Sequence, residues 1–231
     1  MSERILVMGD IHGNSKAMEQ CLDRCEFDSG NDTLIQLGDV CDRHPDSVQV
    51  IEKLLRIPKL IVIRGNHDPW LQSWLSSGET DPVWSSNGGI ATIESYLKIN
   101  DKIDRSRHIT FLENQKNYYI DKENRLFIHA GFTHPKGPQH ETPISNCYWD
   151  RRFWNETMQA RVEGPKPDRL DLFREIFIGH TPTLNWQQDT PIQAFNVWNL
   201  DTGAGWNGKL TVMDVETKEY WQSDFAGELY I

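Results

Sequence analysis

The hydrophobic positions near the start of the chain follow two alternating periods. Short apolar runs typical of buried strands are separated by stretches whose apolar residues recur at helical spacing. The strand-like runs are residues 4–8, 33–37 and 60–64, and the helix-like stretches are residues 16–25 and 47–56. Within the second helix-like stretch, Val48, Ile51 and Leu55 fall on one face. Strands that alternate with amphipathic helices predict βαβ units and a largely parallel sheet.

The pattern changes after residue 70. Residues 70–117 read as helical but irregular and are rich in Trp and Ser, which predicts a peripheral helical lobe on a single domain of residues 1–231. Strand-like segments then return, and we expect the last three of them to be antiparallel and to belong to a second sheet. They are residues 125–128, 175–178, 194–200, 209–214 and 220–221. The proline-rich residues 135–167 predict a loop-heavy stretch that borders the functional site.

Polar, glycine-containing turns follow the predicted strands. The first three turns read GDIHG, GDVCDR and GNHD, and two later strands end in HAG and GHTP. Open α/β sheets place their functional sites at the carboxyl ends of the strands. The turns therefore predict one site, built where these strand ends meet.

Six potential metal ligands lie in these turns. Asp10 and His12 are one residue apart, so both side chains can point the same way from an extended strand end. The other four donors are Asp39, Asn66, His129 and His180. A donor set of carboxylate, amide oxygen and imidazole without thiolate suits Mn, Fe or Zn in an open site. Six donors are too many for one ion with open positions, so they predict two divalent ions about 3.5 to 4 Å apart that share a carboxylate.

Composition narrows the class of protein. A chain of 231 residues can build one substantial α/β core. A net charge of -10 argues against nucleic acid as a partner. The sequence shows no signal segment and no apolar stretch of about 18 residues, so we expect a cytoplasmic protein with no membrane partner. Cys21 and Cys25 fit a buried helix face, and no disulfide framework is expected.

The ordered signature of these turns resembles the calcineurin-like metallophosphoesterases, and above all their phosphoprotein phosphatase branch of bacterial and phage-type enzymes. The motifs extend from Gly9 to Pro182, and Asp201-Thr202-Gly203 resembles the closing segment of the family. The resemblance covers essentially the whole chain. It implies a four-layer αββα sandwich, in which two mixed β-sheets are flanked by helices.

The resemblance also implies how the ligands are shared. Asp10, His12 and Asp39 would hold the first metal ion, and Asp39 would bridge to the second. The remaining ligands of the second ion would be Asn66, His129 and His180. Manganese is the implied metal, with iron or zinc as alternatives.

Further residues take catalytic roles by the same resemblance. His67 would donate a proton to the leaving oxygen and Asp68 would orient it, while Arg43 would bind the phosphoryl oxygens. The run Tyr148-Trp149-Asp150-Arg151 resembles the segment that gives these enzymes a second phosphate-binding arginine, here Arg151, although Arg152 stands next to it. The alternative for Arg43 is a surface ion pair with a neighbouring Asp. The chain departs from the family pattern at His44, where relatives often have glycine.

The predicted reaction is direct attack on phosphorus by a hydroxide that bridges the two metal ions. The predicted substrates are phosphomonoesters, above all phosphoserine and phosphothreonine in proteins, and small phosphoesters should also be cleaved. A diadenosine polyphosphate hydrolase is the alternative, because the GNHD motif and the chain length resemble that sister group too. A non-catalytic scaffold of the same fold should have lost a ligand or His67, and all are present.

Aromatic and remaining histidine residues give weaker expectations. The spacing of Trp70 and Trp74 predicts packing along a helix face. Four tryptophans in loop-like sequence are candidates for an aromatic rim around the substrate: Trp84, Trp149, Trp154 and Trp206. Four histidines are expected to be solvent-facing loop residues: His44, His108, His134 and His140.

Overall fold

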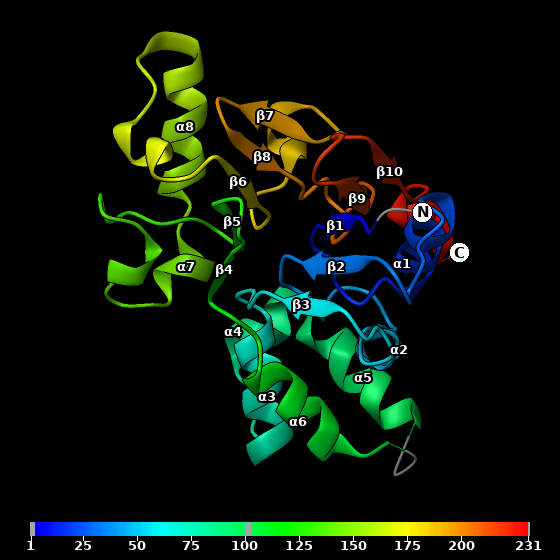
Figure 1. The fold of residues 1–231 in the computed structure, drawn as a ribbon. Coiled ribbons are helices and arrows are strands. Elements are labelled where there is room, and N and C mark those ends of the chain that lie inside the picture. Colours follow the sequence, from blue (N-terminus) through cyan, green and yellow to red (C-terminus); the bar gives the residue numbers. More distant parts are fainter. Residues whose placement is uncertain (1–2, 100–102, 231) are drawn as a thin grey trace.

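Two five-stranded β-sheets lie face to face in the computed structural model, which describes residues 3–99 and 103–230 (Figure 1). The first sheet has the order β10 (Tyr220–Gln222), β9 (Thr211–Asp214), β1 (Ile5–Met8), β2 (Thr33–Gln36) and β3 (Leu60–Val62). The second has the order β4 (Tyr118–Ile120), β5 (Arg125–Ile128), β6 (Glu175–Ile178), β8 (Val197–Asn199) and β7 (Ile192–Ala194). Both sheets contain parallel and antiparallel pairs. The predicted α/β fold of two mixed sheets with flanking helices is confirmed.

Helices cover the outer face of each sheet (Figure 1). The helices near the first sheet are α1 (Ser15–Arg24), α2 (Ser47–Leu54), α3 (Asp68–Ser77), α4 (Pro82–Trp84), α5 (Ile90–Ile99), α6 (Arg105–Glu113) and α9 (Ala226–Leu229). Those near the second sheet are α7 (Asn146–Trp149) and α8 (Arg152–Glu163). Local signals set several of their starts: the Asn14 side chain accepts a hydrogen bond from the Ala17 N–H at 2.9 Å, as an N-cap residue does.

The alternation of side chains along the strands separates three hydrophobic layers. In β1, Leu6 and Met8 pack toward the helices, whereas Val7 points between the sheets. In β6, Ile176 joins the cluster under α8, whereas Phe177 stacks on Phe127 of β5 with ring centroids 5.0 Å apart. Each sheet therefore buries both faces, which explains why its strands read as continuous apolar runs rather than as alternating ones.

The second half of the chain departs from the prediction in its strands. Residues 194–200 are not one antiparallel strand, because Phe195 has a φ of 54° and the chain turns there between β7 and β8. Strand β8 then pairs parallel to β6. Strands β9 and β10 return to the first sheet, where β9 pairs with β1, so they do not extend the second sheet as expected. Pairing partners far apart in sequence decided these placements.

Several elements of the structure are absent from the prediction, and the largest are a strand and a helix. Strand β4 lies just after the helical region and pairs with β5. Helix α8 occupies part of the stretch expected to be loop-heavy, and it buries Phe153, Trp154 and Thr157 against the second sheet. No helix among residues 3–99 and 103–230 is long and apolar enough to cross a membrane.

The region predicted to be helical contains α3, α4, α5 and α6, joined between α4 and α5 by a π-helical turn at Ser85–Gly89. We call residues 68–99 and 103–113 the helical lobe. Helix α3 ends at Gly78, whose φ of 74° lies in the left-handed region. Helix α5 contacts α2. The Asp42 N–H, in the loop that joins β2 to α2, donates a hydrogen bond to the Thr92 hydroxyl of α5, so the helical lobe also reaches this loop.

Candidate active site

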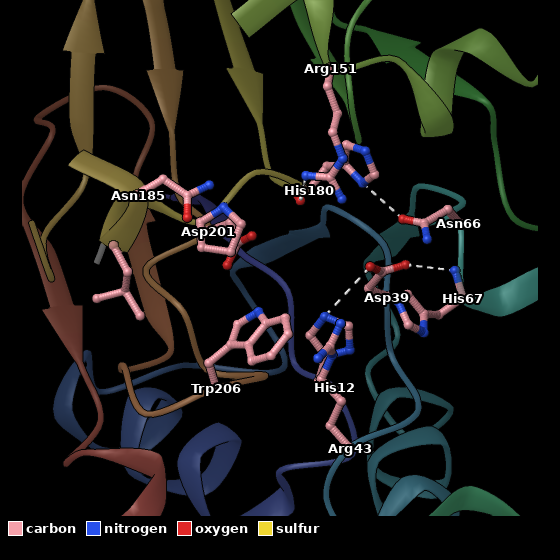
Figure 2. A pocket seen from close by; sticks show the side chains of 12 residues that line it. His12, Asp39, Arg43, Asn66, His67, Arg151, His180, Asn185, Asp201 and Trp206 are labelled. Carbon is pink, nitrogen blue, oxygen red and sulfur yellow. Dashed lines mark hydrogen bonds and ion pairs between the residues drawn. The ribbon is translucent and has the colours of Figure 1, made fainter. Parts of the chain in front are cut away.

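Four of the six predicted metal ligands line one cavity at the carboxyl ends of the strands: His12, Asp39, Asn66 and His180 (Figure 2). The other two contact these ligands, His129 through Asn66 and Asp10 through the His180 N–H. Asp10 and His12 follow β1, Asp39 follows β2 and Asn66 follows β3, all from the first sheet. His129 follows β5 and His180 follows β6, so the second sheet supplies the other side. All six side chains are buried. Facing sheets whose parallel strands end at the same edge bring these residues together.

Asp39 lies at the centre of this arrangement. Its Oδ2 atom is 3.6 Å from Nε2 of His12 and 3.5 Å from Nε2 of His129. Two groups of donors within 4.8 Å of one another share it: one with His12 and His67, the other with His129 and His180. A Cβ atom at Gly65 would lie 2.1 Å from Oδ1 of Asp39, so only glycine leaves room for this carboxylate. Asp39 is therefore placed to be shared by two ions.

Hydrogen bonds fix which ring nitrogen of each histidine faces the cavity. His129 contacts the Leu37 carbonyl through Nδ1 at 2.7 Å, and His12 contacts the Cys41 carbonyl through Nδ1 at 3.1 Å. In both residues this leaves Nε2 facing Asp39 as a lone-pair donor. Backbone carbonyls that orient the far nitrogen in this way are typical of metal-ligating histidines.

The amide and the remaining carboxylate complete the set. Oδ1 of Asn66 lies 3.2 Å from Nε2 of His129 and 2.8 Å from Nδ1 of His180. Asp10 accepts a hydrogen bond from the His180 N–H through Oδ2 at 3.0 Å, whereas its buried Oδ1 has no partner. An unpartnered buried carboxylate oxygen costs free energy unless something electropositive contacts it.

Charges in the cavity also fit divalent cations. Burial and the neighbouring Asp201 and Asp39 raise the pKa of Asp10 well above its usual value. Within the described part of the chain, neither Asp10 nor Asp39 forms an ion pair with a lysine or arginine. Burial lowers the pKa of His12, His129 and His180, which favours the neutral imidazole that binds metals. These residue groups fit a dinuclear divalent metal site.

Backbone conformation at the cavity is strained. Five non-glycine residues of these turns have positive φ angles, and such residues cost about 1 to 3 kcal/mol each unless the surroundings hold them. They are His12, Asp39, Asp42, Arg43 and His180. Strain concentrated in the turns that carry the polar residues is typical of functional sites.

His67 also faces the cavity, but its orienting partner differs from the prediction. Nδ1 of His67 lies 2.6 Å from Oδ2 of Asp42, so Asp42 contacts the ring and Asp68 does not. The Asp68 carboxylate instead accepts hydrogen bonds from the backbone N–H groups of Asp39, Val40 and Gly65. Asp68 therefore ties the β2 and β3 turns together.

Arg43 lines the same cavity beside an aromatic ring. Its guanidinium carbon lies 3.9 Å from the ring centroid of Trp206, and its buried Nε has no hydrogen-bond partner. Among the described residues it forms no ion pair with Asp42 or Asp46, which was the alternative expectation. Its side chain is thus free to bind an anion in the cavity.

The two adjacent arginines of the α7–α8 junction point to different places. Arg151 lines the cavity and its Nη1 lies 3.5 Å from the Thr181 hydroxyl (Figure 2). Arg152 pairs with Asp150 at 3.2 Å, and 70% of its side chain is exposed. Only Arg151 of the pair is placed to meet a bound phosphoryl group.

His44, the departure from the family pattern, fits its turn without strain. It is absent from the residues with positive φ, so the backbone there does not require glycine. Its Nε2 contacts the Ala204 carbonyl at 2.8 Å, and its ring stacks on Tyr230 with centroids 5.3 Å apart. The ring is half-buried, so the expectation of a solvent-facing loop residue is wrong here.

Other expectations for aromatic and histidine side chains need correction. Trp84 and Trp154 are buried and do not line a rim, whereas Trp149 and Trp206 are exposed. His108 lies in α6, fully buried between Tyr96 and Glu52. Of the remaining two, His140 is exposed and His134 half-buried. Residues distant in sequence bury Trp84, Trp154 and His108, so the local sequence gives no indication that these side chains are buried.

The cavity has a volume of about 390 Å³ and includes residues that were not predicted. Asp201 and Asn185 lie on the side of Trp206 (Figure 2), and Leu184 and Pro182 also line the cavity. Burial raises the pKa of Asp201 to about 7, and Asp39 adds to the rise. The Asp-Thr-Gly motif could have indicated Asp201, since it too follows a strand, β8.

Comparison with known proteins agrees with this geometry. The family of calcineurin-like phosphoesterases matches residues 3–206. The chain belongs to this family. It is 27% identical to the symmetrical bis(5'-nucleosyl)-tetraphosphatase of Neisseria meningitidis, with 95% of each chain covered. It is 25% identical to serine/threonine-protein phosphatase 1 of Salmonella typhimurium, with 92% of each covered. Among solved structures, a candidate diadenosine tetraphosphatase superposes with a TM-score of 0.63 at 19% identity, covering 95% of this chain and 92% of the other.

Membership of the family makes this protein a metal-dependent phosphoesterase. Its relatives carry both substrate names, so the phosphoesterase class is established and the substrate is not decided by the match.

Proposed function

We propose that this phosphoesterase is a dinuclear metallophosphatase that hydrolyses phosphomonoesters, including phosphoserine and phosphothreonine in proteins. The observation that carries the proposal is that an acid–base histidine, two arginines and four of the metal donors line one cavity, with the other two donors, Asp10 and His129, in contact with them. All of these groups are needed for phosphoryl transfer to water, and a scaffold without activity would not need to keep them together.

The metal ions would be held by the predicted ligands in two groups that share Asp39. These ligands are Asp10, His12, Asp39, Asn66, His129 and His180. Two divalent cations at such a site neutralise charge on the phosphoryl oxygens and make water acidic enough to act as a nucleophile. Manganese suits this donor set, as iron and zinc do.

Two arginines bind and orient the phosphoryl group. Arg43 and Arg151 both line the cavity, and a planar guanidinium can donate two parallel hydrogen bonds to phosphate oxygens. Because Arg43 stacks on Trp206, its guanidinium is held in one plane before substrate arrives. This lowers the entropy lost on binding.

His67 supplies the proton for the leaving oxygen. The Nδ1–H group donates to Asp42, which directs Nε2 and its proton away from Asp42. Burial lowers the pKa of His67, but the charge of Asp39 and the hydrogen bond with Asp42 outweigh burial and raise it. A ring held in this orientation by Asp42 can deliver its Nε2 proton to a departing alkoxide.

The extent of the alignments favours the monoesterase. The match to the Salmonella phosphatase extends over 223 residues, close to the 231 residues of this chain. The match to the Neisseria tetraphosphatase extends over 277, so that relative contains segments with no counterpart here. This agreement in aligned length is what favours the phosphatase reading.

A symmetrical dinucleoside tetraphosphate hydrolase is the second candidate, and Trp206 favours it. This indole is 55% exposed at the edge of the cavity, with Asn185 and Leu184 also lining the wall. An exposed indole beside a phosphate site can stack a nucleobase, a contact worth about 1 to 3 kcal/mol per base.

Steady-state hydrolysis distinguishes the candidates. We would compare a phosphoserine peptide with diadenosine tetraphosphate, using wild type and His67→Asn in Mn²⁺ with and without chelator. Peptide turnover that requires metal and His67 supports the proposal. Preferential cleavage of the dinucleotide replaces it with the second candidate, and turnover of neither substrate overturns both.

A further inference from the structure

We propose that Trp84 and Thr92, two buried residues of the helical lobe, are positioning residues for the proton-donating pair of His67 and Asp42. This inference rests on the proposed function, because both residues would act through His67. Neither residue lines the cavity, and neither belongs to the motifs that mark the site in the sequence.

Asp42 needs partners from outside its own turn. It is fully buried, its φ is 78°, and no lysine or arginine pairs with it in the described part of the chain. A buried carboxylate is stable in its charged form only when hydrogen bonds satisfy its oxygens. His67 satisfies Oδ2 at 2.6 Å, which leaves Oδ1 without a contribution from the ring.

Thr92 of α5 binds both the backbone and the side chain of Asp42. The Thr92 hydroxyl donates to Oδ1 of Asp42 at 2.7 Å and accepts from the Asp42 N–H at 2.8 Å. Since its one proton is used, the Ser47 hydroxyl 2.8 Å away must donate to it. The hydroxyl therefore uses its full capacity of one donor and two acceptors to fix this turn.

Trp84 of α4 supplies the second donor. Its indole N–H lies 2.9 Å from Oδ1 and 2.8 Å from Oδ2 of Asp42, so it bridges the carboxylate. The ring is fully buried, and a Cβ atom at Gly89 would lie 2.5 Å from it. Glycine at this position lets the backbone of the π-helical turn pack on the ring and hold its orientation.

The same turn of the helical lobe also holds the phosphate-binding arginine. The Gly88 carbonyl accepts a hydrogen bond from the Arg43 N–H at 3.1 Å. Gly88 has a φ of 105°, and a Cβ atom there would lie 2.7 Å from the Arg43 nitrogen. The helical lobe thus contacts two successive residues of the strained β2 turn, Asp42 and Arg43.

The consequence for catalysis follows from the direction of the ring. Asp42 fixes the tautomer and the plane of His67 only while its own carboxylate cannot rotate, as in other His–Asp pairs. Loss of a donor would let the carboxylate turn and would misalign the proton on Nε2. Only reactions that need this proton should then slow down.

The test compares leaving groups. Thr92→Val keeps the shape and removes the hydroxyl, and Trp84→Phe keeps a buried ring and removes the N–H. We expect each to lower kcat about tenfold on phosphoserine, whose alkoxide needs a proton. On p-nitrophenyl phosphate, whose leaving group is stable as an anion, we expect less than about a threefold loss. KM should change little, because neither residue touches substrate.

Matched controls come from α8. Thr157→Val removes a buried hydroxyl that donates to the Phe153 carbonyl, and Trp154→Phe removes a buried N–H that has no partner. Both controls should leave the ratio of the two kcat values unchanged. Thr92→Ser keeps the hydroxyl and should restore the phosphoserine rate, which loss of packing alone does not explain.

Two kinetic results would overturn the inference while leaving the proposed function intact. One is an equal loss on both substrates, which indicates a damaged metal site. The other is a further loss when Thr92→Val is added to His67→Asn, because residues that act as a unit should not add. The ¹H NMR signal of the His67 Nδ1–H in magnesium-loaded protein gives a readout that needs no substrate. It should shift in both variants, and an unchanged signal contradicts the inference whatever the substrate is.

Discussion

The strand-end turns and the helical lobe contribute to the same site in different ways. The turns carry groups that can touch substrate or metal, and each turn combines several of them within a few residues, as Asp10 and His12 show. The helical lobe supplies Trp84 and Thr92, whose side chains hydrogen-bond to Asp42 and do not line the cavity. The groups that act on substrate or metal therefore lie close together in short sequence motifs. The groups proposed to hold them in place are scattered through helices.

The largest effect should come from the centre of the strand-end turns. Asp39→Asn removes the carboxylate shared by both donor groups, so kcat/KM should fall about 10³-fold or more. Asp32→Asn is a control, because Asp32 is also buried but pairs with Arg4 away from the cavity. It should lower the unfolding temperature and keep the metal content. Equal metal content in Asp39→Asn and wild type, measured by atomic emission, would contradict the shared-ligand role.

The second-largest effect is expected at Asp42, which the strand-end turn carries and the helical lobe contacts. Asp42→Asn should lower kcat on phosphoserine about 10²-fold. It should also change the pH profile: the protonated ring of His67 is the active form, so activity declines as pH rises through its raised pKa. Without the Asp42 charge that pKa falls, and the decline should begin at lower pH. An alkaline limb of kcat/KM that stays in place would rule out Asp42 as the partner that tunes His67.

A smaller effect is expected at the edge of the cavity. Trp206→Ala removes the ring under Arg43 and should raise KM about three- to tenfold. Tyr220→Ala removes another exposed aromatic residue, outside the cavity, and should leave KM unchanged. A much larger KM increase with diadenosine tetraphosphate than with the phosphopeptide would favour the second candidate function.

The smallest effect concerns the stability of the helical lobe. Burial lowers the pKa of His108, although its hydrogen bond with Glu52 opposes this. The neutral ring therefore stabilises the fold above the unfolded-state pKa of about 6.5, and this contribution is lost as pH falls toward the lower folded-state value. The unfolding temperature should drop by about a few degrees more on acidification in wild type than in His108→Gln. If the unfolding temperature of both proteins depends on pH in the same way, His108 does not contribute to the pH dependence of stability.

Local sequence predicted the first sheet's parallel strands well, because each apolar run is followed directly by its turn and helix. It failed where distant partners decide the outcome. Residues 209–214 read as a strand, but only the pairing of Val7 with Met213 assigns them to the first sheet. Helix α8 was hidden in a proline-rich stretch, since its buried face, with Phe153 and Trp154, depends on the second sheet.

The candidate site shows the same division. The predicted donors lie together because the motif residues follow strands whose ends meet. The partner of His67 was assigned to Asp68, the next residue, whereas the structure brings Asp42 to the ring across 25 positions of sequence. Asp68 is the acid next to His67 in the sequence, whereas Asp42 reaches the ring only because the β2 turn folds toward it, where Asp42 accepts hydrogen bonds from Thr92 and Trp84.

A metal titration tests whether this cavity binds two divalent ions that are required for phosphatase activity. Metal-free protein, prepared with chelator, would be titrated with Mn²⁺ while bound metal and hydrolysis of p-nitrophenyl phosphate are measured together. Two equivalents should bind per chain, with full activity reached only at the second. Full activity without added metal, or saturation of binding and activity at one equivalent, would contradict this expectation.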